Sequence, residues 1–116
     1  MIKVGQTKKA RYWGKYEVKD VVQLKKPIVC RSKEIGAALF QPTIVRIKWE
    51  VPPSSDKHEF WFPYWISIEG KEKYGQFAPM IGENALLELF EGAIDRGFFS
   101  KSFLKRLNKK INGVLT

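Results

Sequence analysis

The feature that most constrains the fold is an alternation of apolar and charged side chains in PTIVRIKWEV, residues 42–51. The apolar positions are Val45, Ile47, Trp49 and Val51, and the charged positions between them are Arg46, Lys48 and Glu50. Successive side chains of a strand point to opposite faces of a sheet, so this period of two predicts a strand with one buried face.

A second extended run, HEFWFPYWISIEG at residues 58–70, follows a loop rich in turn-forming residues, PPSSDK at 52–57. Two such runs predict an antiparallel hairpin. If Val51 lies opposite His58, the apolar face pairs Trp49 with Phe60, Ile47 with Phe62 and Val45 with Tyr64. A slip by one residue would place the aromatic row against Arg46 and Lys48, so burial favours this register or an even shift from it.

In this register the core receives Phe60, Phe62, Tyr64, Ile66 and Ile68. The opposite face pairs Trp61 with Lys48, Pro63 with Arg46 and Trp65 with Ile44, and so mixes tryptophan with cations. Proline cannot donate a ladder hydrogen bond, so the strand must be unpaired on the side that the Pro63 nitrogen faces. Residues 69–72 fit a two-residue turn in which Gly70 is the first turn residue. The segment after this turn would then pair with the strand before it only as far as Tyr64.

Two helices are expected at the C-terminal end. Residues 83–97 carry apolar side chains at helical spacing, and Gly97 suits the left-handed position that ends a helix. Ser100 can cap a second helix that ends near Gly113, whose apolar stripe we expect the core to need. The stripe consists of Phe103, Leu104, Leu107 and Ile111.

These patterns predict a single basic α+β domain over residues 1–116, with a small antiparallel sheet packed on one face by the two C-terminal helices. The sheet comprises the hairpin 42–51/58–69 and additional short strands. Residues 18–24 fit a strand or a short helix, residues 27–31 fit a strand, and residues 32–40 fit one or two helical turns.

The net charge of +9 is unevenly distributed along the chain. Residues 1–33 carry ten cations and two acids, residues 34–95 carry five cations and ten acids, and residues 96–116 carry six cations and no acid. Two basic ends around an acidic middle favour a polyanionic partner. The alternative is that the basic ends fold against the acidic middle and neutralise it.

The N-terminal stretch KKARYWGKYEVK, residues 8–19, interleaves cations with aromatic rings. Cations can neutralise phosphates and rings can stack on bases, the combination that sites for single-stranded nucleic acid use. The alternative is a first strand whose rings join the core. The candidate nucleic-acid-binding residues are Lys8, Lys9, Arg11, Tyr12, Trp13, Lys15 and Tyr16, with Arg46, Lys48, Trp61 and Trp65 from the mixed face of the hairpin.

The sequence offers little for catalysis. Cys30 and His58 are the single cysteine and histidine, too few for a zinc site, and nothing in the sequence pairs them as a nucleophile and its base. We expect Cys30 to be a buried structural thiol. Asp56 with Glu69 and Lys71 mimics a metal-dependent nuclease motif. The two carboxylates, however, lie at opposite ends of one extended run, roughly 40 Å apart. Glu17 or Asp20 could approach Glu69 in the fold, which leaves a nuclease as an alternative, but we expect no catalytic residue, metal or cofactor.

The function expected is non-catalytic binding of nucleic acid, RNA or a single strand rather than duplex. The alternative is a homodimer or protein-interaction module that uses Trp61 and Trp65, and a small enzyme is the third possibility. The start MIKVGQTKK lacks the apolar centre of a secretory signal, and no apolar stretch is long enough to span a bilayer. We expect a cytoplasmic protein with no membrane partner.

Overall fold

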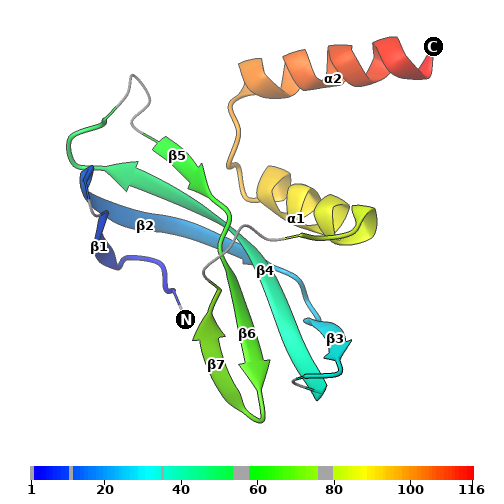
Figure 1. Cartoon of the computed structure of the whole chain (residues 1–116). Helices are drawn as coiled ribbons and strands as arrows, with labels where there is room; N and C mark the ends of the chain where they lie inside the picture. The colour runs from blue at the N-terminus through cyan, green and yellow to red at the C-terminus, as the bar shows by residue number, and fades with distance from the viewer. Residues whose placement is uncertain (1, 11, 35, 54–57, 76–79) are drawn as a thin grey trace.

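The structure, a computed structural model, describes residues 2–10, 12–34, 36–53, 58–75 and 80–116. Figure 1 shows the strands and the two helices that follow them. The strands are β1 (Thr7–Ala10), β2 (Gly14–Gln23), β3 (Ile28–Ser32), β4 (Gly36–Trp49), β5 (His58–Trp61), β6 (Tyr64–Ile68) and β7 (Lys71–Tyr74), and the helices are α1 (Glu83–Asp95) and α2 (Lys101–Leu115). Every strand pairing is antiparallel. The predicted α+β class is therefore confirmed.

The long strand β4 organises the curled sheet. Its first half pairs with β3 and β6, and its second half pairs with β2 and β5. The main path through the sheet is β1-β2-β4-β6-β7, so β1 and β7 are its two ends. The predicted hairpin between residues 42–51 and 58–69 is present, and β4 provides its first strand.

The register of that hairpin differs from our prediction by three residues. Trp61 lies opposite Val45 and Phe60 opposite Arg46; Trp65 lies opposite Gln41. Because three is an odd shift, every side chain of β5 and β6 points to the face opposite to the one predicted. Trp61 and Trp65 share the face of the apolar row of β4, whereas Phe60 shares the face of Arg46 and is 39% exposed.

The prediction was wrong because both faces of this sheet are buried. One face holds what we call the tryptophan core, namely Ile2, Val18, Val45, Ile47, Trp49 and Trp65. The other face holds the helix-side core, namely Val22, Leu24, Ile44, Leu89, Ala93 and Phe98. An aromatic row can be accommodated on either face of such a sheet, so burying one row does not select the register.

The β6–β7 hairpin extends to Tyr64, as we predicted, but its turn residues differ from the predicted ones. At the end of this hairpin the Gly75 N–H donates to the Tyr64 carbonyl at 2.8 Å. On the β4 side, the Thr43 N–H donates to the Pro63 carbonyl at 3.0 Å. The turn residues are Glu69 and Gly70, both with positive φ (52° and 79°), so Gly70 is second rather than first. Positive φ at both positions is typical of the type I′ turn, whose twist matches that of the paired strands.

The described part of the first forty residues consists of strands joined by turns. Residues 18–24 fall mainly in β2 and residues 28–32 form β3. Among the described residues of 32–40 no helix forms, because residues 36–40 belong to β4 and pair with β3. Cys30 is exposed on β3, which corrects the expectation of a buried thiol.

Helix α1 packs on the sheet through β2 and β4. Leu89 and Ala93 are its buried residues, and Gly97, two residues after the end of the helix, has φ +71° as the sequence predicted. Gly92, which looks unfavourable within a helix, lies where a Cβ would come within 2.7 Å of a Val22 methyl carbon. The glycine therefore lets α1 approach β2 closely.

Helix α2 begins as predicted, since the Ser100 hydroxyl accepts a hydrogen bond from the Phe103 N–H at 3.1 Å. It continues past Gly113 to Leu115, and none of its residues is buried. Phe103 is 44% and Ile111 is 46% exposed, so the expectation that the core needs this stripe is wrong. The physical reason is that α1, Phe98 and Phe99 already pack on the helix side of the sheet.

This arrangement predicts unequal effects of the same change in the two helices. Replacing Ile111 with Ser should change the free energy of unfolding by less than about 0.5 kcal/mol, because the side chain is exposed. Replacing Leu89, which is 2% exposed, with Ser should cost more than about 2 kcal/mol. Chemical denaturation of both variants checks this, and equal losses would contradict the exposed position of α2.

Candidate functional site

A pocket of about 520 Å³ lies on the face of the sheet that carries the tryptophan core. It combines two lysines with four aromatic side chains, and we call it the basic-aromatic pocket. Its lining residues are Ile2, Lys8, Lys9, Tyr16, Trp61, Trp65 and Tyr74. Five of the residues that the sequence nominated thus come together, namely Lys8, Lys9, Tyr16, Trp61 and Trp65.

The curl of the sheet assembles this pocket. Lys8 and Lys9 belong to β1 and Tyr74 belongs to β7, the two ends of the strand path, yet all three line one hollow. Hydrogen bonds from Gly5 N–H to Val18 O and from Val18 N–H to Gln6 O, both 2.8 Å, hold the N-terminal segment on β2. Ile2, in the segment before β1, lines the same pocket as Tyr74 of β7, and Figure 1 shows this segment running from β1 toward β7.

The rings form a continuous series. Tyr16 contacts Trp49 and Trp61, with ring centroids 5.4 Å and 6.5 Å apart. Tyr74 contacts Trp61 at 5.8 Å and Trp65 at 5.9 Å. All four pairs meet edge to face or tilted, the arrangements that aromatic pairs prefer. The pocket wall is therefore a set of mutually packed aromatic rings.

Its members differ in exposure. Trp65 is 7% exposed and belongs to the core, Tyr74 is 50% exposed, and Trp61 and Tyr16 are half-buried. The predicted placement of both tryptophans on the face of Arg46 and Lys48 is therefore corrected, and their exposure, which the sequence left open, differs: Trp65 is part of the core, and Trp61 contributes to the pocket surface. Lys8 and Lys9 are exposed, and Lys8 lies directly opposite Tyr16.

Burial and the nearby Tyr74 raise the pKa of the Tyr16 hydroxyl above its ordinary value. The direction follows because burial disfavours the charged phenolate. Tyr16 therefore remains a neutral hydroxyl, able to donate a hydrogen bond, throughout the physiological pH range.

The turn between β1 and β2 carries two exposed aromatic side chains. Tyr12 is 76% and Trp13 is 60% exposed. The Trp13 N–H donates to the Ala10 carbonyl at 3.3 Å, and Gly14 follows with φ +92°, which lets the chain reverse. Lys15 is exposed opposite Lys9. Arg11 lies outside the described residues.

Arg46 and Lys48 do not join the pocket, because the observed register places Trp61 and Trp65 on the opposite face of the sheet from these two cations. The Arg46 guanidinium lies 5.9 Å from the centre of the Phe98 ring, and its Nε is buried with no hydrogen-bond partner in the described part of the chain. Lys48 lies opposite Glu17. A 2.6 Å ion pair with Lys19 lowers the pKa of the Glu17 carboxyl.

No family model, curated protein or solved structure matches the chain significantly.

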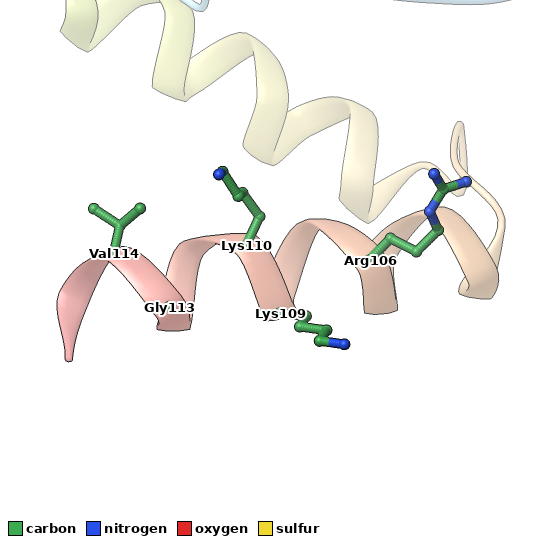
Figure 2. Close-up of a pocket in the computed structure, with 5 residues that line it drawn as sticks. All are labelled: Arg106, Lys109, Lys110, Gly113 and Val114. Atoms are coloured by element: carbon green, nitrogen blue, oxygen red, sulfur yellow. The ribbon is translucent and has the colours of Figure 1, made fainter.

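A second hollow of about 530 Å³ lies along α2. Figure 2 shows Arg106, Lys110 and Val114 pointing to the side on which α1 lies and Lys109 pointing away. All of its lining residues come from one helix, so it offers an incoming group no contact from a second element. We do not regard it as a binding site.

Across the described ranges, no three His, Cys, Asp or Glu side chains group closely enough to hold a metal ion. Within the same ranges, no helix has the length and apolarity needed to cross a bilayer. Asp56 of the nuclease-like pattern lies outside the described residues.

Our sequence reasoning missed Ile2 and Tyr74 as members of the pocket. Choosing Glu69 and Gly70 as the turn residues would have identified Tyr74, because that turn places Tyr74 opposite Trp65. No local signal identifies Ile2, which reaches the site only because the chain before β1 lies back along β2.

Proposed function

We propose that this protein binds single-stranded nucleic acid, RNA in particular, without catalysing a reaction. One observation carries the proposal: two lysines and a series of aromatic rings line the same pocket of about 520 Å³. Lysine ammonium groups neutralise phosphates, and rings stack on bases of any sequence.

The form of the pocket favours a single strand over a duplex. A hollow between strands can admit an unstacked base, whereas bases in a duplex are already stacked and paired. RNA is recognised mainly in such single-stranded regions, where splayed bases stack on aromatic side chains. Tyr12 and Trp13 at the β1–β2 turn would add a second stacking position next to the pocket, and Lys15 would add a further phosphate contact.

The charge distribution supports the same proposal. Within residues 1–33 the excess of cations is eight, and β1 and the start of β2 carry several of them. A polyanion would therefore be attracted to the side of the molecule that holds the pocket.

Binding is tested by fluorescence anisotropy with a labelled single-stranded RNA of about 20 nucleotides at about 50 mM salt, where even non-specific electrostatic binding registers. Four or five engaged cations should give a slope of log K against log salt near −3, at about −0.7 per contact. Replacing both Lys8 and Lys9 with Gln should reduce the slope by about 1.4. Replacing Trp13 with Ala should weaken binding by about 1–3 kcal/mol and leave the slope unchanged.

The matched control replaces Lys25 and Lys26 with Gln. Both are exposed and lie beyond the far end of β2, away from the β1–β2 turn, and the net charge changes equally. An unchanged salt slope is expected. A slope that falls equally in both double variants would show that overall charge, and not the pocket, attracts the RNA. Absence of any anisotropy change with the wild-type protein would contradict the proposal.

Self-association through Trp61 and Trp65 is the alternative proposal. Trp65 is 7% exposed, so such an interface would draw mainly on Trp61 and on Tyr74, which is 50% exposed. Replacing Trp61 alone with Ser should then convert a dimer into a monomer in sedimentation experiments. A wild-type monomer across the accessible concentration range would remove this alternative.

A further inference from the structure

A smaller hollow of about 360 Å³ adjoins the basic-aromatic pocket and shares Tyr16 and Trp61 with it. Its lining residues are Ala10, Tyr16, Ile47, Trp49, Glu59, Phe60 and Trp61. They include one carboxylate and no cation, so we call this hollow the Glu59 pocket. The Tyr16–Trp61 contact thus separates a cationic hollow from an anionic one.

The position of the Glu59 carboxylate is defined by the fold. Glu59 lies opposite Ile47 on β4, and its Oε1 accepts a hydrogen bond from the Trp49 indole N–H at 2.6 Å. One oxygen is thereby held against the aromatic wall. Among the described residues no cation forms an ion pair with Glu59, and a carboxylate can accept several hydrogen bonds, so acceptor capacity remains for an incoming group.

This separation of charge matches the two ends of a nucleotide. A phosphate is attracted by Lys8 and Lys9 and repelled by Glu59, whereas a base edge with N–H groups can donate to a carboxylate. Aromatic rings line both hollows, so a base could stack in either one. The carboxylate therefore determines which base is preferred in the smaller hollow.

We infer that the Glu59 pocket receives a base whose Watson–Crick edge donates hydrogen bonds, guanine before all others. This inference rests on the proposed binding of single-stranded RNA. Guanine presents two adjacent donors, N1–H and the 2-amino group, which suit a carboxylate. Adenine and cytosine each present one amino donor beside an acceptor. Uracil presents one N–H between two carbonyl oxygens, which the carboxylate repels.

The test compares octamers of uridine with octamers that carry one guanosine, adenosine or cytidine at the centre. A single substitution avoids the self-structure of guanosine-rich strands. The wild-type protein should bind the guanosine octamer about tenfold or more tightly than the uridine octamer, the discrimination typical of a well-paired base edge. Inosine, which lacks the 2-amino group, should lose a large part of this preference without any change in the protein.

The protein variant is Glu59→Gln. The amide oxygen can still accept from the Trp49 indole, so the fold should be retained, but the charge is lost. The preference for guanosine should fall to within about threefold. The matched control, Glu50→Gln, removes the same charge from an exposed residue just after β4 and should keep the preference.

The outcomes separate two failures. If no octamer binds at low salt, the proposed function itself is contradicted. Two results would overturn the role of Glu59 while leaving RNA binding intact. The first is equal affinity for all octamers. The second is a preference for guanosine that survives Glu59→Gln, together with equal affinity for the inosine and guanosine octamers. If Glu59→Gln fails to fold, the inosine comparison alone decides.

Discussion

Replacing Ile47 with Asp is expected to unfold the protein. Ile47 is 5% exposed in the tryptophan core, between Val45 and Trp49 on β4. An unpaired carboxylate at this position costs several kcal/mol, a large part of the roughly 5–15 kcal/mol that stabilises a domain of this kind. Circular dichroism during heating should show no cooperative transition above room temperature.

The control places the same charge on the surface. Val51 is 78% exposed just beyond β4, so Val51→Asp should melt within a few degrees of the wild type. Native-like melting of Ile47→Asp would mean that the face carrying Trp49 is not a packed core.

The second large effect is expected from Gly75→Ala. A Cβ at Gly75 would overlap the Tyr64 ring at Cε2, Cζ and Cδ2. Neither group can move easily, because the Gly75 N–H donates to the Tyr64 carbonyl and the Tyr64 ring, 9% exposed, packs against Phe40 at 5.1 Å. The loss should be about 3 kcal/mol or more, at the upper end of the range for overpacking.

Gly113→Ala is the matched control for this change. A Cβ there meets no atom within 4 Å, and alanine favours a helix over glycine by about 0.5–1 kcal/mol. Denaturant titration should therefore show α2 unchanged or slightly more stable. A Gly75→Ala protein as stable as the wild type would contradict the close approach of β7 to Tyr64.

Local patterns were sufficient for most elements of the fold. The alternation around Ile47 predicted the second half of β4, the spacing of Leu89 and Ala93 predicted α1, and Ser100 predicted the start of α2. These features depend on neighbours within a few residues, which the sequence displays directly. The pairing of residues 58–69 with β4 was likewise expected, because the loop between them is rich in turn formers.

The register could not be derived in this way. Its choice depended on the assumption that only one face of β4 is buried, yet Ile44 on the other face is 1% exposed beneath α1. Whether a helix covers the second face is a matter of tertiary packing. The same is true of α2: its stripe has the spacing of a core helix, but the place on the sheet is taken by α1 and Phe98.

For the candidate site, the sequence by itself determined the residue types: lysines and rings in β1 and β2, and tryptophans in β5 and β6. The tertiary structure alone decided which of them meet. The curl of the sheet brings Lys8 to Trp61 and Tyr74, while the odd shift in register places Trp61 and Trp65 on the face opposite Arg46 and directs Glu59 to Trp49. The reason is physical: a binding pocket depends on contacts between residues distant in the chain, and a one-residue change in pairing reverses every side chain of a strand.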